Sequence, residues 1–141
     1  CKVIHAEPGK RIKYEFTVTK DVLNTIGTLH GGCLATVLDV CMGNLVYDGN
    51  GITQQPGVSV DLSVSYMNAV KLGETIIIEA NMLKHGKKYM NAVKLDETII
   101  IEANTLKHGK KLAFLEAKVF RKSDNSIVAI GKQTLAIIPK K

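Results

Sequence analysis

Residues 24–47 read NTIGTLHGGCLATVLDVCMGNLVY, and the expected fold is built around them. From Cys33 to about Tyr47 the stretch is apolar nearly all round, which predicts a helix covered by other parts of the molecule. The turn-forming residues DGNG at 48–51 end this helix. Asp39 interrupts the apolar pattern, and a lone carboxylate in apolar surroundings is a candidate general base or nucleophile.

An amide, a histidine and a Gly-Gly pair lie at the expected N-terminus of this helix: Asn24, His30, Gly31 and Gly32. Free backbone N–H groups and the positive end of the helix dipole can stabilise an oxygen that gains negative charge. With Asp39, this pattern suggests acyl-transfer chemistry. Two plainer roles stay open, because Asn24 can cap a turn and His30 can position the loop by hydrogen bonding.

Strands are expected before and after this helix in the sequence. Val58, Val60, Leu62 and Val64 alternate with Ser59, Asp61, Ser63 and Ser65, which is typical of a strand. Further strands are predicted at residues 11–19, 75–81, 112–120 and 126–138. One long helix with several antiparallel strands predicts an α+β fold, and 141 residues make one domain over residues 1–141.

The chain contains a tandem repeat within that domain. Residues 66–88 and 89–111 are two 23-residue copies that differ only at Gly73/Asp96 and Met82/Thr105. A stacking repeat array needs at least three units, so this pair indicates a duplication instead. The extra copy is expected to form an added hairpin or to pair between molecules; a looped-out copy is the alternative, in which three isoleucines would lose burial worth about 1.5–3 kcal/mol each.

Composition limits the classes of ligand and compartment. The net charge of +6 fits nucleic acid or a small polyphosphate-bearing ligand, but aromatic residues are only 5% of the chain and give few stacking surfaces for nucleic acid. Three cysteines without a pairing pattern predict a reducing compartment, the cytoplasm, with the mitochondrion as the alternative. No apolar run is long enough to span a membrane, and the four histidines lack metal-ligand spacing.

The pattern Asn24-x-x-Gly27-x-x-His30-Gly31-Gly32-x-x-Ala35-x-x-x-Asp39 resembles the hotdog-fold acyl-CoA thioesterases. The similarity is to the thioesterase superfamily member 2 type, related to phenylacetyl-CoA thioesterases, and it extends over nearly the whole chain. The resemblance implies a long central helix wrapped by an antiparallel sheet, to which the duplication adds a strand or hairpin. It also implies a tetramer built from dimers, and no cofactor, because coenzyme A (CoA) is part of the substrate.

The resemblance also implies site residues. Asn24 and the N–H of Gly31 would polarise the thioester carbonyl, Asp39 would activate water with help from Ser59, and the role of His30 stays open. The CoA contacts would come from Lys20, Tyr66, Met67, Asn68 and Lys71. The repeat leaves two sets of rival contacts: Lys107, Gly109, Lys110 and Lys111 of the second copy, or Lys84, Gly86, Lys87, Lys88, Tyr89 and Lys94.

The second copy runs directly into the strand at 112–120, so its lysine turn is the expected contact. The turn at 84–88 and the segment 89–94 would then form the inserted hairpin.

Gly31 and Asp39 are eight residues apart, about 12 Å of helix, whereas an attacking water must lie about 3–3.5 Å from the carbonyl carbon. The working pair is therefore expected to come from two subunits of a homodimer. We expect an enzyme that hydrolyses medium- to long-chain or aryl acyl-CoA to free acid and CoA. The alternatives are a non-catalytic acyl-CoA-binding hotdog module and a hotdog dehydratase.

Overall fold

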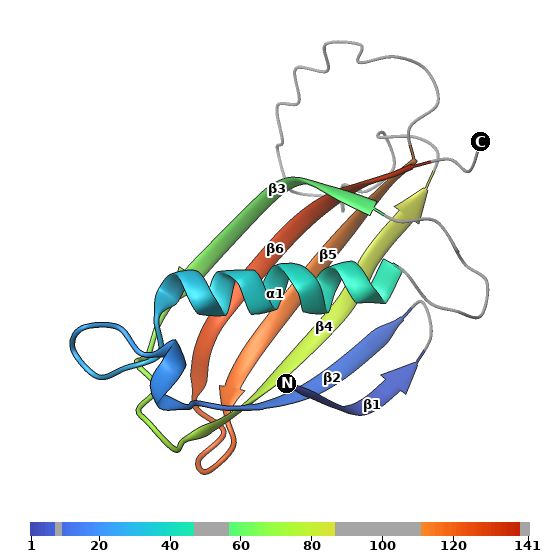
Figure 1. The fold of residues 1–141 in the computed structure, drawn as a ribbon. Helices are drawn as coiled ribbons and strands as arrows, with labels where there is room; N and C mark the ends of the chain where they lie inside the picture. The colour runs from blue at the N-terminus through green and yellow to red at the C-terminus, as the bar shows by residue number, and fades with distance from the viewer. Residues whose placement is uncertain (8–9, 47–56, 87–110, 139–141) are drawn as a thin grey trace, which may run out of the picture.

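The computed structural model describes residues 1–7, 10–46, 57–86 and 111–138, excluding the side chains of residues 84–86 and 111. Its elements in chain order are β1 (Lys2–Glu7), β2 (Arg11–Thr17), the short 3-10 helix η1 (Lys20–Val22), α1 (Gly31–Val46), β3 (Gly57–Tyr66), β4 (Thr75–Gly86), β5 (Lys111–Arg121) and β6 (Ile127–Ile137). The helix lies across one face of an antiparallel sheet whose strand order is β1-β2-β4-β5-β6-β3 (Figure 1). This is the α+β hotdog arrangement that the sequence predicted.

The helix packs on the sheet through a stripe of apolar side chains. Its buried residues recur at helical spacing: Leu34, Leu38, Cys41, Met42, Leu45 and Val46. They meet the inward face of the central strands, where Ile76, Ile78, Leu115 and Val119 are at most 1% exposed. Val40 on the outer face of the helix is 55% exposed, so in this single chain the sheet covers one side of the helix.

Most predicted strands are present, with shifted ends. The strand predicted at 11–19 is present as β2, in which Tyr14 is buried and Ile12 and Phe16 pack against the core. The structure also contains β1, which the sequence analysis did not predict and which pairs with β2 at the sheet edge. Within the described residues, no helix is long and apolar enough to cross a membrane.

The strand of the first repeat copy lies inside the sheet. β4 pairs with β2 on one side and with β5 on the other, and its last residues, 84–86, pair with 114, 113 and 112. Residues 84–86 therefore continue a central strand, and the expectation that they begin an inserted hairpin is wrong. The second copy falls almost wholly within residues 87–110, outside the described part of the chain, so its predicted strand or hairpin stays a prediction.

Candidate active site

Asp39 is the single charged residue of α1 and is half-buried against the sheet. Its Oδ1 accepts a hydrogen bond from the hydroxyl of Ser59 on β3, at 2.7 Å. The same oxygen accepts a hydrogen bond from the side-chain amide of Gln133 on β6. Oδ2 accepts no hydrogen bond from the described residues. One carboxylate oxygen is therefore held from two strands, while the other can receive a proton.

Ser59 reaches Asp39 because of an irregularity in β3. A regular alternation would place Ser59 on one face of β3 and Val58, Val60, Leu62 and Val64 on the other face. The β3–β6 register, however, shifts between Ser59 and Asp61. This β-bulge turns Ser59 to the helix side, together with its cross-strand partner Leu135. Val58 and Val60 are instead 53% and 64% exposed. The predicted pairing of Ser59 with Asp39 is thus present, but by a geometry that the alternation did not show.

Gln133 is the residue of this cluster that sequence reasoning missed. It is 3% exposed, and its amide also donates to the Ser59 hydroxyl at 3.0 Å. Gly131 lies two residues earlier on the same face of β6, where an added Cβ would come within 3.2 Å of Leu38 Cδ1. The missing side chain lets α1 lie close to β6 beside the cluster. The sequence does contain a signal for a buried polar contact at this position. Gln133 alternates with Leu135 and Ile137, so it lies on the same, otherwise apolar face of the strand.

His30 immediately precedes α1 and caps its N-terminus. Its ring Nδ1 accepts a hydrogen bond from the N–H of Gly32 at 2.9 Å, and its backbone N–H donates to the Val22 carbonyl at 2.8 Å. Nδ1 acting as an acceptor indicates the neutral tautomer with hydrogen on Nε2. In this chain His30 therefore positions the loop and helix. The adjacent N–H of Gly31 has no acceptor among the described residues, and it can donate to an anionic oxygen at the helix N-terminus.

Asn24 organises the turn that leads to the helix. Its Oδ1 accepts from the N–H groups of Ile26 and Thr28 at 3.1 and 3.0 Å, and its Nδ2 donates to the Thr28 hydroxyl at 2.8 Å. A side-chain amide has two N–H donors, so one remains after this contact. The turn-capping role is present in the structure, and the remaining N–H keeps the predicted carbonyl contact available.

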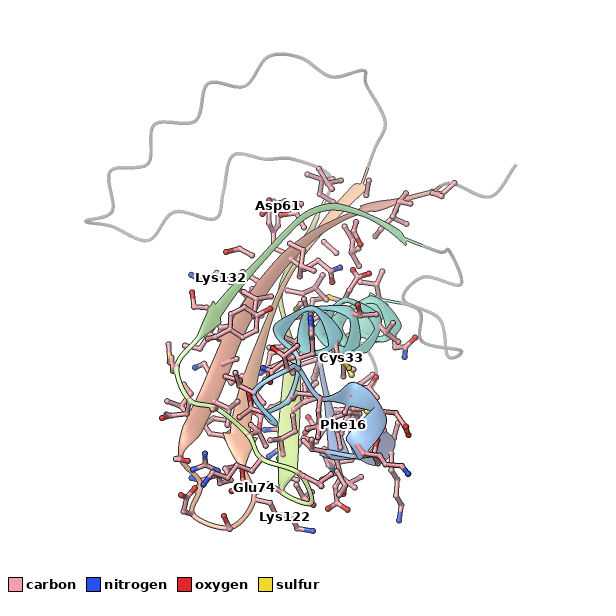
Figure 2. The ribbon with its side chains drawn as sticks, turned by 60° about the vertical axis from the view of Figure 1, so that its left-hand side comes forward. Phe16, Cys33, Asp61, Glu74, Lys122 and Lys132 are labelled. Carbon is pink, nitrogen blue, oxygen red and sulfur yellow. The ribbon has the colours of Figure 1, made fainter. Side chains whose placement is uncertain are left out.

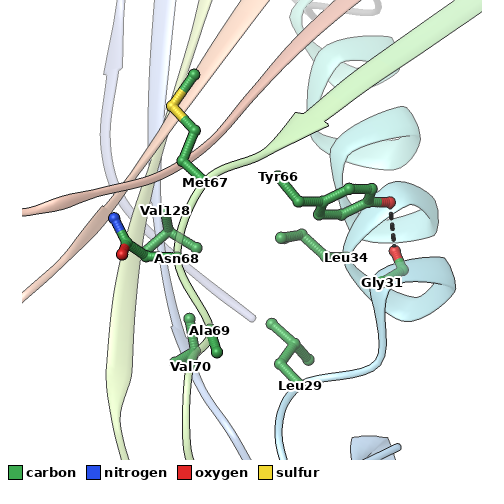
Figure 3. A pocket seen from close by; sticks show the side chains of 9 residues that line it. All are labelled: Leu29, Gly31, Leu34, Tyr66, Met67, Asn68, Ala69, Val70 and Val128. Atoms are coloured by element: carbon green, nitrogen blue, oxygen red, sulfur yellow. Dashed lines mark hydrogen bonds between the residues drawn. The ribbon is translucent and has the colours of Figure 1, made fainter.

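A cavity of about 330 Å³ opens beside the N-terminus of α1 (Figure 3). The Tyr66 hydroxyl donates to the Gly31 carbonyl at 2.7 Å across one wall. Apolar side chains dominate its lining, which consists of Leu29, Gly31, Leu34, Tyr66, Met67, Asn68, Ala69, Val70 and Val128. The structure thus brings three predicted CoA contacts, Tyr66, Met67 and Asn68, to the predicted oxyanion donor.

The predicted lysine contacts are less completely placed. Lys20 is exposed on η1, and Lys71 is exposed with its backbone N–H donating to Glu74 at 2.7 Å. Lys84 and Gly86 belong to the end of β4 and Lys111 begins β5. The other candidates lie outside the described residues: Lys87, Lys88, Tyr89, Lys94, Lys107, Gly109 and Lys110.

The candidate site residues therefore form two groups, each centred on a different part of α1. Asp39 lies with Ser59 and Gln133, whereas Gly31 lies with Tyr66, and the eight-residue separation corresponds to about 12 Å along α1. Burial raises the pKa of the Cys41 thiol to about 12, so this helix residue is not a ready thiolate nucleophile. No cluster of three or more histidine, cysteine or acidic side chains suited to a metal occurs within the described ranges.

Comparisons with known proteins identify the family of this chain and agree with its fold. A family model described as thioesterase superfamily matches residues 26–92. Acyl-coenzyme A thioesterase 13 of Homo sapiens is 45% identical over 133 residues, which cover 94% of this chain and 76% of that protein. The crystal structure of zebra fish thioesterase superfamily member 2 has a TM-score of 0.73 at 31% identity, covering 96% of this chain and 80% of that one. A Streptococcus mutans protein crystallised with acetyl CoA shares the fold, with a TM-score of 0.73 at 21% identity over 99% of this chain and 90% of that one. The chain belongs to the thioesterase superfamily.

Proposed function

We propose that this protein hydrolyses acyl-CoA thioesters to a free carboxylic acid and CoA, with medium- to long-chain or aryl acyl groups as substrates. The observation that carries the proposal is the half-buried Asp39 carboxylate, held at Oδ1 by Ser59 and Gln133 and open at Oδ2. The name of the human relative, an acyl-coenzyme A thioesterase, supports the choice of thioester. The apolar lining of the cavity supports an apolar acyl group or the pantetheine arm.

In the proposed reaction, Asp39 Oδ2 takes a proton from water as the water oxygen attacks the thioester carbonyl carbon. The N–H of Gly31, with the remaining N–H of Asn24, stabilises the oxyanion of the tetrahedral intermediate. Collapse of the intermediate breaks the carbon–sulfur bond, and the proton held by Asp39 passes to the leaving sulfur. The products are the acid and CoA with a free thiol. Lys20 and the segment from Tyr66 to Lys71 are proposed to contact the CoA portion.

The direct test is steady-state hydrolysis of acetyl-, hexanoyl-, palmitoyl- and phenylacetyl-CoA, monitored by released thiol. We expect turnover of the longer or aromatic thioesters, because the apolar cavity favours them over acetyl-CoA. Tight binding of acyl-CoA without thiol release would instead identify a non-catalytic binding module. The proposal would be contradicted if the protein neither bound any of these acyl-CoA thioesters nor released thiol from them.

We further propose that the working site is shared between two subunits of a homodimer, which pairs into a homotetramer. Asp39 cannot reach a carbonyl held at Gly31 of its own helix, because about 12 Å separates them and attack requires about 3–3.5 Å. Gly31 of one subunit would act with the carboxylate of the other. Val40 is exposed on the outer face of α1, and Val58 and Val60 are exposed on the outward face of the edge strand β3. These two uncovered apolar surfaces support contacts with further copies of the chain.

Mixing Asp39→Asn chains with Asn24→Ala chains is expected to restore part of the activity. A heterodimer would contain one site with both residues intact, and random pairing of equal amounts would make about half of the dimers heterodimers, so about a quarter of the parent activity per chain is expected. Thiol release is measured after co-refolding, with each variant alone as the control. Verified heterodimers without any recovery would contradict a shared site.

A further inference from the structure

We propose that Gln133 is a positioning residue for this site: its amide fixes the direction of the Ser59 proton and holds Asp39 with Oδ2 turned toward the attacking water. The inference rests on the proposed thioester hydrolysis and extends it, because it assigns a role to a third side chain that the motif around Asp39 does not include. It is drawn from the hydrogen bonds and burial of side chains between α1, β6 and the edge strand β3.

Gln133 occupies a place where an apolar side chain is expected. It faces the helix from β6, where its cross-strand partners are Leu62 on β3 and Leu115 on β5. At 3% exposure it is the buried polar residue of the core in the described part of the chain. Burial of an amide is unfavourable unless hydrogen bonds replace water, so the contacts of this side chain explain why it is tolerated.

Both hydrogen bonds that the Gln133 amide donates go to the other two members of the cluster, Asp39 and Ser59. Nε2 donates to Asp39 Oδ1 and, at 3.0 Å, to the Ser59 hydroxyl oxygen. Its Oε1 is buried and has no donor among the described residues. The orientation of the amide is therefore determined by Asp39 and Ser59 alone, since a reversed amide would put Oε1 against a carboxylate oxygen.

The three side chains form a closed ring of hydrogen bonds. Because Ser59 accepts from Gln133, its own hydrogen is directed to Asp39, where the hydroxyl donates at 2.7 Å. A serine hydroxyl can otherwise rotate to suit other partners. With two donors on Oδ1, the carboxylate is fixed about its side-chain torsion, and Oδ2 is left for the proton of the attacking water. Gln133 acts through the other two residues and does not itself touch the reacting atoms.

The nearest charged positions on the two strands lie on the opposite face of the sheet. Asp61 pairs with Thr134, and Lys132 pairs with Ser63, both outward of the helix side. Figure 2 shows Asp61 and Lys132 on the sheet surface away from α1. Asp39 is therefore the charged member of the cluster, and a second charge introduced at position 133 would act mainly on it.

The test is a pair of substitutions, Gln133→Met and Gln133→Glu, with Thr134→Val as the matched control on the outward face of the same strand. Gln133→Met keeps the bulk but removes both donors, so kcat is expected to fall 10- to 100-fold with KM within twofold of the parent. Its Tm should be equal or higher, because a buried acceptor without a donor is also removed. Thr134→Val should keep kcat, KM and Tm near the parent values.

Gln133→Glu supplies a second readout, which depends on contact between position 133 and the reacting base and not on the stability of the fold. A second carboxylate beside Asp39 makes the two groups share a proton, so the acidic limb of the kcat/KM profile should move to higher pH. Unchanged kcat in Gln133→Met would overturn the proposal. A kcat loss that is matched by a fall in Tm, together with an unmoved pH profile in Gln133→Glu, would overturn it in favour of a structural role.

An activity-independent measurement separates this inference from the proposed function. In ¹H–¹⁵N spectra the side-chain NH₂ signals of Gln133 should shift in Asp39→Asn and in Ser59→Ala, whether or not the parent hydrolyses any thioester. Signals that stay at the parent positions in both variants would overturn the hydrogen-bonded ring. Shifted signals in a protein that releases no thiol from any acyl-CoA would support the ring and contradict the hydrolytic reaction.

Discussion

Asp39→Asn is expected to lower kcat for acyl-CoA hydrolysis by roughly 10²–10⁴-fold, with little change in KM. Asparagine keeps the shape of aspartate, and its oxygen can still accept from Ser59 and Gln133, as Asp39 Oδ1 does. The atom in the place of Oδ2 would then be an NH₂ group, which cannot take a proton from water. The measurements are steady-state thiol release and calorimetric binding of a non-hydrolysable thioether analogue of acyl-CoA.

Asp61→Asn is the matched control for this prediction. Asp61 lies on β3, two residues after Ser59, but it is exposed and its cross-strand partner is the outward Thr134. The same chemical change there should leave kcat and KM within a factor of two of the parent values. Undiminished hydrolysis by Asp39→Asn would show that another group acts as the base. If Asp39→Asn abolished both analogue binding and turnover, Asp39 would instead organise the pocket.

The central helix and its carboxylate could be predicted because both depend on local pattern. The apolar run after Gly32 is long enough to specify a helix, and a single charge within it is conspicuous. The edge strand β1 could not be predicted in the same way. Five of its six residues are exposed, so the strand buries neither face, and its pairing with β2 depends on tertiary context.

The presence of Ser59 beside Asp39 and Gln133 depends on a bulge in β3 that the alternation of polar and apolar residues cannot show. In residues 58–65 the apolar positions alternate regularly, yet the bulge between Ser59 and Asp61 reverses the faces before it. Ser59 was predicted from family resemblance, and the regular pattern alone would have placed it away from Asp39. Gln133 was visible as a polar residue in phase with Leu135 and Ile137, but its partners come from α1 and β3, far away in the chain.

Removing one repeat copy is expected to leave the fold intact and to raise its stability. β4 and β5 are paired at Gly86 and Leu112, and 25 residues of the sequence, 87–111, separate these two positions. Deleting residues 89–111 leaves Lys87 and Lys88 there, the loop length of a tight hairpin. Loop-closure entropy favours the shorter connection by about 2 kcal/mol, at about 0.6 kcal/mol per doubling of length. Lysines do not suit such turns, so a net gain of about 1 kcal/mol is expected, measured by urea unfolding.

Deleting residues 66–88 instead supplies a matched control, because the two 118-residue products differ only by Gly73 against Asp96 and Met82 against Thr105. Gly73 has a φ of +81°, which a residue with a side chain adopts at a cost of about 1 kcal/mol. Met82 packs against the core, and replacing it with threonine loses a further ~1 kcal/mol of apolar burial. The product lacking 66–88 should therefore be less stable by about 2 kcal/mol. Equal stabilities would contradict the stabilising roles given to Gly73 in the turn and to Met82 in the core contact of β4.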